Sequence, residues 1–169
     1  SNDIVIPDNQ TGYYYMPGRG FWTGKLLGLN GSTATNSTFY FRENYVRGVP
    51  QGDWSGFYGS VYAYAWTNVT PGSWQTSEIR WNGGGTNGGM PNLMLNVGPA
   101  VNFYSLGMNP MRIGSLIANP GAQMQGSSAN LGVNTTWVIG QLSLSNYIGC
   151  RIIDAVNLVK VGTNVLVLD

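Results

Sequence analysis

The sequence predicts an all-β protein: an antiparallel β-sandwich or jelly roll formed by a single domain over residues 1–169. Apolar and polar residues alternate along many short segments, and turn signals recur every eight to twelve residues or so. No strand–helix alternation is present, which argues against a parallel α/β sheet. The 169 residues show no linker and no internal repeat, and they suffice to bury one core.

In the N-terminal half, five segments are expected to form strands. They are Asp3–Ile6, Thr11–Met16, Phe21–Leu29, Ser37–Arg47 and Tyr58–Trp66. The third segment ends at Asn30-Gly31, a dipeptide that strongly favours a hairpin turn. The fifth shows the clearest period of two, because Tyr62, Tyr64 and Trp66 fall on one face and smaller residues on the other.

In the C-terminal half, six further segments are expected to form strands. They are Ser77–Trp81, Leu93–Val97, Arg112–Ala118, Thr135–Ser145, Ile148–Lys160 and Val165–Leu168. The segment Ile148–Lys160 also fits a short helix, but its β-branched residues favour a strand. Loops are expected at Pro50–Gly56, at the glycine-rich Asn82–Gly89 and at the polar Ala122–Gly132.

Charged residues make up only 9% of the chain, against roughly 25% in an average protein. Eight basic and seven acidic residues do not form the basic surface that a nucleic-acid binder needs. No apolar run is long enough for a transmembrane helix, so no membrane insertion is expected. Residues 81–111 and 113–150 carry no charge at all, which favours a subunit of a homo-oligomer or a larger assembly over a monomer covered by polar amides.

The residue types that most enzymes and metal proteins use are scarce. The chain has no histidine and therefore no imidazole base, and its mid-chain carboxylates Glu43, Asp53 and Glu78 show no paired spacing. We expect no enzymatic activity, no metal site and no cofactor. Cys150 is the single cysteine, and we expect it to be buried, reduced and unpaired.

Aromatic residues and amides near turns are the remaining signal for a binding site. A glycan site needs an aromatic platform and a few placed polar groups, and loops between strands commonly carry such sites. The candidate glycan ligands are Asp53, Trp54, Trp74, Trp81, Asn82 and Asn87. The alternative is that the tryptophans close the ends of the core.

Two local segments resemble known families. Asn134–Gly140, Ser145–Tyr147 and Cys150-Arg151, followed by apolar strands, look like the end of the jelly-roll spike proteins of small icosahedral DNA phages. Leu93–Pro99, Ile113–Ala118 and Gly126–Ala129 resemble strands of bacterial fimbrial tip lectins, although those domains usually carry a disulfide that this chain cannot form internally. Both resemblances imply an exposed β-protein at a biological surface.

Together these observations indicate a non-enzymatic virion protein, a capsid, spike or tail-fibre component that self-assembles and contacts a host receptor or glycan. Folding without disulfides agrees with a protein made in a reducing cytoplasm and used on the virion surface. The alternative is a carbohydrate-binding adhesin domain of an extracellular bacterial surface fibre.

Overall fold

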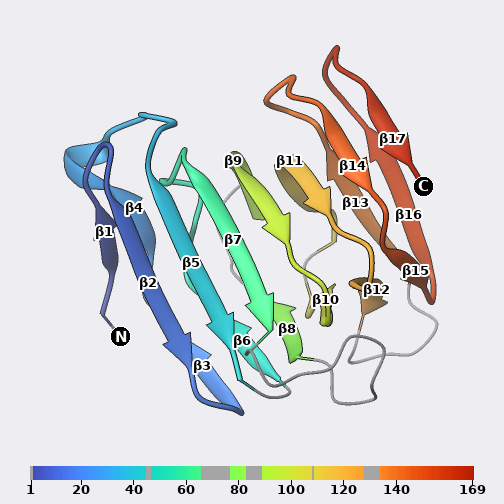
Figure 1. Cartoon of the computed structure of the whole chain (residues 1–169), viewed down its shortest axis with the longest axis horizontal. Helices are drawn as coiled ribbons and strands as arrows, with labels where there is room; N and C mark the ends of the chain where they lie inside the picture. Colours follow the sequence, from blue (N-terminus) through green and yellow to red (C-terminus); the bar gives the residue numbers. More distant parts are fainter. Residues whose placement is uncertain (1, 45–46, 66–76, 83–88, 108, 128–133) are drawn as a thin grey trace.

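The computed structural model shows a parallel β-solenoid rather than the expected antiparallel β-sandwich or jelly roll. It describes residues 2–44, 47–65, 77–82, 89–107, 109–127 and 134–169. Every strand pair in this part of the chain is parallel, and each strand lies beside a strand from the preceding or following coil. Figure 1 shows the coils following one another from the N-terminal to the C-terminal end of the molecule.

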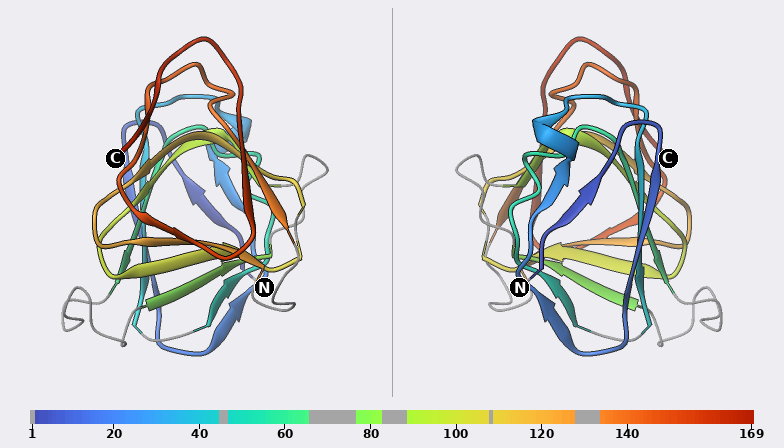
Figure 2. Two further views of the ribbon diagram at one scale, coloured as in Figure 1. Left: turned by 90° about the vertical axis from the view of Figure 1, so that its right-hand side faces the viewer. Right: turned by 90° about the vertical axis from the view of Figure 1, so that its left-hand side faces the viewer.

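Three sheets form the sides of the solenoid, and the end-on views in Figure 2 show the roughly triangular outline that they enclose. The two-stranded sheet contains β1 (Ile4–Ile6) and β4 (Leu26–Gly28), and a short 3-10 helix, η1 (Leu29–Gly31), follows β4. The six-stranded sheet contains β3 (Gly20–Trp22), β6 (Gly48–Pro50), β8 (Ser77–Trp81), β10 (Val101–Ser105), β12 (Gln123–Ser127) and β15 (Arg151–Ile153). The nine-stranded sheet contains β2 (Thr11–Met16), β5 (Thr38–Glu43), β7 (Ser60–Ala65), β9 (Gly89–Val97), β11 (Met111–Ala118), β13 (Thr135–Ile139), β14 (Asn146–Ile148), β16 (Val156–Lys160) and β17 (Leu166–Leu168).

The core is a column of side chains from equivalent positions of successive coils. In a strand, alternate residues point to opposite faces, so parallel register places inward residues directly above one another. One inward row of the nine-stranded sheet comprises Phe39, Val61, Leu95 and Leu116, all of which are buried. A second buried row comprises Phe41, Ala63, Val97 and Ala118. The column therefore accounts for the period of two without any antiparallel pairing.

Several expected strands exist, but their ends and connections differ. The expected strand Phe21–Leu29 is two strands, β3 and β4, separated by a corner of the coil, and Asn30-Gly31 lies in η1 instead of a hairpin turn. The expected loop over residues 50–56 begins in β6, and the expected polar loop over residues 122–132 contains β12. The sequence does not predict strand β10, because Gly, Pro and Asn residues surround it.

The antiparallel prediction was wrong because alternation and frequent turns are equally compatible with both architectures. Parallel neighbours need a long connection, and here the rest of each coil is that connection. The length of this connection varies along the solenoid: Tyr147 and its partner Val167 are much closer in sequence than Tyr62 and its partner Asn96. Because the number of residues per coil varies, the sequence does not show the regular repeat that usually identifies a solenoid.

Among the described residues, we find no helix with the length and apolar character needed to span a membrane.

Candidate functional site

The two described tryptophans of the expected glycan site lie in the core. Trp54 and Trp81 are each only 2% exposed, and their rings meet edge to face with centroids 4.9 Å apart. The ring centroids of Trp54 and Trp22 are 5.3 Å apart, and the Trp54 ring packs edge to face with Phe39. Buried rings of this kind offer no free face to a ligand, which agrees with the alternative that the tryptophans close the core.

The remaining expected ligands are not gathered into a described cluster. The Asp53 carboxylate accepts a hydrogen bond from the Ser55 backbone N–H at 2.9 Å and so stabilises its own turn. Asn82 is partly buried after β8, and its backbone N–H donates to the Pro50 carbonyl. Trp74 and Asn87 lie outside the described residues. The site as a set of six residues therefore stays a prediction.

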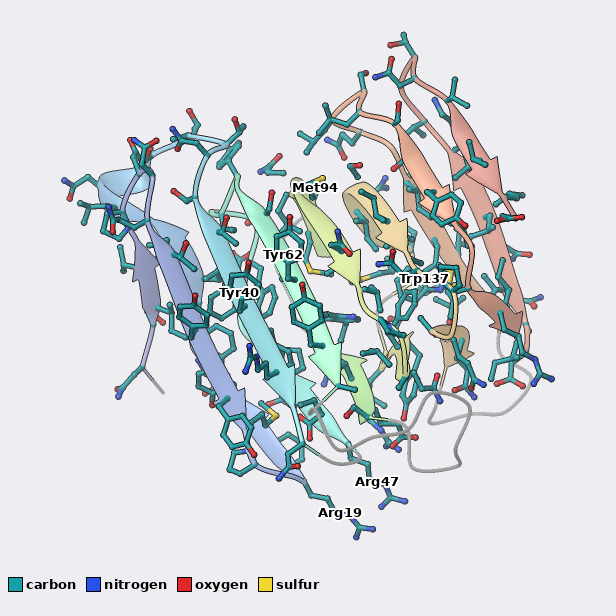
Figure 3. All side chains as sticks on the ribbon, viewed as in Figure 1. Arg19, Tyr40, Arg47, Tyr62, Met94 and Trp137 are labelled. Atoms are coloured by element: carbon teal, nitrogen blue, oxygen red, sulfur yellow. The ribbon has the colours of Figure 1, made fainter. Side chains whose placement is uncertain are left out.

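A different aromatic surface is evident on the outer face of the nine-stranded sheet. Tyr13, Tyr40 and Tyr62 occupy equivalent positions on β2, β5 and β7, so parallel register places them side by side. Figure 3 shows Tyr40 and Tyr62 on neighbouring strands. Their ring centroids are 5.1 Å and 5.2 Å apart, with interplanar angles of 9° and 21°. We call these three residues, together with Tyr64 on β7, the tyrosine ladder.

The ladder is a stack of rings on neighbouring strands. Its centroid distances of 5.1 Å and 5.2 Å are close to the spacing of about 4.8 Å between strands of a sheet. Tyr13 on the outer strand is 69% exposed, and Tyr40 and Tyr62 are partly exposed. Tyr64 stacks against Tyr40 and Tyr62 with centroids 5.9 Å and 6.1 Å away. The result is a row of partly exposed aromatic rings with phenolic hydroxyl groups.

Arg42 is adjacent to the ladder. It is an exposed residue of β5, and register places it between Tyr15 on β2 and Tyr64 on β7. Tyr40, Arg42, Tyr64 and Ala65 line an open depression of about 330 Å³. This depression combines two aromatic rings with one guanidinium group.

The Tyr64 hydroxyl is held in its neutral form. Burial raises the pKa of Tyr64 above its ordinary value, and the phenols of Tyr40 and Tyr62 raise it further. The positive charge of Arg42 lowers the same pKa, but this effect is the smallest of the four. A neutral phenol both donates and accepts hydrogen bonds, which suits the recognition of hydroxyl-rich ligands.

Sequence reasoning found the components of the ladder but not the ladder itself. The run Tyr13–Tyr15 and the shared face of Tyr62 and Tyr64 are visible in the sequence. However, Tyr13, Tyr40 and Tyr62 lie on three different strands that are far apart along the chain. Only the parallel register joins them, and an antiparallel sheet would have paired different residues.

The carboxylates considered for catalysis differ in their surroundings. Glu43 is fully buried on β5, and Glu78 on the six-stranded sheet forms an ion pair with Arg80 at 3.0 Å. Asp53 lies in the turn described above. Within the described ranges, no three His, Cys, Asp or Glu side chains gather in a way that could hold a metal ion.

Comparison of the chain with protein-family models, with curated proteins and with solved structures gave no match.

Proposed function

We propose that this protein is a non-enzymatic binding module displayed at a biological surface, where the tyrosine ladder binds an oligosaccharide. The observation that carries the proposal is the row of partly exposed, stacked tyrosine rings on a parallel sheet. Aromatic rings bind the apolar faces of sugars, and phenolic and amide groups bind the hydroxyls.

The spacing of the ladder favours a chain of sugars over a single sugar. Successive rings are separated by 5.1 Å and 5.2 Å, which is close to the length of one pyranose unit in an extended oligosaccharide. Beyond Tyr62, the same outward row continues with Asn96, whose amide oxygen accepts a hydrogen bond from the Asn119 amide and whose amide nitrogen can donate to a sugar hydroxyl. The binding surface would therefore run along the solenoid, across its strands.

For the biological setting, we keep a virion surface component, a capsid, spike or tail-fibre part, as the leading proposal and a bacterial adhesin as the alternative. The sparse charge and the uncharged stretches support a protein that works within an assembly. A solenoid also suits this role, because it presents a long, regular surface.

Binding to a panel of immobilised neutral and acidic oligosaccharides, followed by titration calorimetry of the best ligands, tests the proposed activity. We expect affinity to rise with chain length up to about three sugar units. Tyr40→Ala and Tyr62→Ala should each weaken binding roughly tenfold, which corresponds to about 1.4 kcal/mol. Tyr147→Ala is the matched control, because Tyr147 occupies the same outward row several strands away.

Thermal unfolding of each variant separates a lost contact from a lost fold. Absence of binding to every oligosaccharide of the panel would contradict the proposal. Equal affinity of the Tyr40, Tyr62 and Tyr147 variants would show that binding occurs elsewhere on the molecule.

A further inference from the structure

We infer that the ladder selects acidic sugars, with the carboxylate of a uronic or sialic acid bound by Arg42 while Tyr40 and Tyr64 hold the ring. This inference rests on the proposed function and specifies its ligand. The residues that carry it form the lining of one depression on β5 and β7.

Arg42 is available for an anion. Its side chain is exposed on the outer face of the sheet, and it forms no ion pair with any described carboxylate. A guanidinium group donates two parallel hydrogen bonds to a carboxylate, in a geometry that a neutral hydroxyl cannot match. Arg42 is therefore suited to distinguish an acidic sugar from its neutral counterpart.

Two further arginines lie in the segments that follow β2 and β5. Arg19 precedes β3 and Arg47 precedes β6, and the pairing of Gly20 with Gly48 places them on neighbouring coils. Figure 3 shows both side chains beyond the ends of β2 and β5. Both are exposed, and neither has an ion-pair partner in the described part of the chain.

The charge is therefore local, even though the whole chain has a net charge of only +1. Of the nearest described acids, Glu43 points into the core and Glu78 is paired with Arg80 on another sheet. Arg42 within β5, and Arg19 and Arg47 after β2 and β5, form no ion pair with any described acid, so they add positive charge to the coils that carry the aromatic row. Such positive charge attracts anionic ligands and orients them on approach.

The depression also fits a ring with an attached carboxylate. The Tyr40 and Tyr64 centroids are 5.9 Å apart, with an interplanar angle of 17°, so the two rings lie nearly parallel to each other in the lining of the depression. Arg42 lies beside these rings, because the strand register pairs it with Tyr15 on β2 and with Tyr64 on β7. A sugar ring over the tyrosines would place its carboxylate toward the guanidinium group.

Two ligand pairs that differ in charge test the inference with the intact chain. The first pair is trigalacturonate and its trimethyl ester, and the second is sialyllactose and its methyl ester. In titration calorimetry at about 0.15 M salt, we expect one acidic member to bind at least tenfold more tightly than its neutral partner. Arg42→Gln should abolish this preference, and Arg42→Lys should retain only part of it.

Arg151→Gln is the matched control, since Arg151 is exposed on β15 of a different sheet. It removes the same charge and should leave the preference intact. Melting temperatures identify any variant that has lost its fold, and Arg19→Gln and Arg47→Gln should reduce the preference by smaller factors.

The outcomes separate the two proposals. If acidic and neutral members bind equally, or if Arg42→Gln retains the preference, the inference is overturned while glycan binding by the ladder stands. If neither pair binds and no neutral oligosaccharide of the earlier panel binds, the proposed function itself fails. The Tyr40→Ala and Tyr64→Ala variants could also bind the acidic ligands as tightly as the wild type. This result would show that charge attraction alone binds these ligands, and it would also overturn the inference.

Discussion

At the scale of single residues, Cys150 combines burial with an unreactive thiol. Its side chain is only 6% exposed, as the sequence predicted, and burial raises the pKa of the thiol to about 11. Because the thiolate is the reactive form, an increase of about two pKa units reduces reactivity roughly a hundredfold. We expect labelling with a disulfide reagent at pH 8 to be slower by about this factor in the native protein than in denaturant. A native protein that labels as fast as the unfolded chain would contradict this.

Trp54 is a second residue whose role its burial indicates. It packs against Trp22, Trp81 and Phe39, and its indole N–H has no hydrogen-bond partner among the described residues. Trp54→Ala should therefore lower the free energy of unfolding by about 3–5 kcal/mol through lost packing alone. Glycan affinity, corrected for the folded fraction, should stay unchanged. Denaturant titration and calorimetry on one sample measure both quantities, and lost affinity with unchanged stability would instead indicate that Trp54 contacts the glycan.

At the scale of elements, β11 shows how a gap between strands is bridged. On one side, the first residues of β11 pair with β13 and its last residues pair with β14. The middle residues of β11 therefore have no strand partner on that side. The buried Asn146 fills this gap, because its amide oxygen accepts from the Leu116 N–H and its amide nitrogen donates to the Leu144 carbonyl, both at 2.8 Å.

Asn146→Ala should destabilise the protein by about 1–3 kcal/mol, because it leaves the buried Leu116 N–H without an acceptor. Asn157→Ala, at an exposed position of β16, should change stability by no more than about 0.5 kcal/mol. Urea unfolding of both variants measures the difference. Equal effects of the two substitutions would show that the amide bridge contributes nothing specific.

At the scale of the whole molecule, the C-terminal end of the solenoid is apolar. Val165 is 64% exposed and Leu168 is 61% exposed, and β16 and β17 have no strand on their outer side in the described part of the chain. Exposed apolar side chains and long uncharged stretches of sequence favour association. We expect a concentration-dependent homo-oligomer that buries more than about 1,000 Å² per contact.

Sedimentation equilibrium of matched variants tests this association. Leu168→Lys should shift the protein toward monomer, whereas Ile117→Lys, in the middle of the outward face, should not. A wild-type protein that stays monomeric at high concentration would exclude association through this end.

The pH dependence of stability is also a property of the whole molecule. Burial raises the pKa values of Tyr14, Tyr64 and Cys150, and the hydrogen bond to Asp169 raises the pKa of Tyr147. Groups with raised pKa values stabilise the fold fully below their unfolded values and lose this contribution as the pH rises through their folded values. Melting temperature should therefore fall from about pH 9 upward. Cys150→Ala should lose less stability than wild type between pH 9 and pH 11, and a flat profile would contradict the expectation.

The sequence by itself determines that the chain is all-β, where most of its strands lie and which residues of a strand share a face. This information is local, because a period of two depends only on neighbouring residues. It also predicts that Cys150 is buried and that charge contributes little to the surface, since both follow from residue type and composition.

Only the tertiary structure decides that the strands are parallel and that Tyr13, Tyr40 and Tyr62 form one ladder beside Arg42. Register between coils is a long-range property, and here the intervals between partners vary with the loops inserted at the corners. The tryptophans that looked suited to a ligand are buried for the same reason, since closing each coil brings Trp22, Trp54 and Trp81 together inside it. Alternation specifies which way a side chain points relative to its strand, whereas the path of the coil determines which side chains become neighbours.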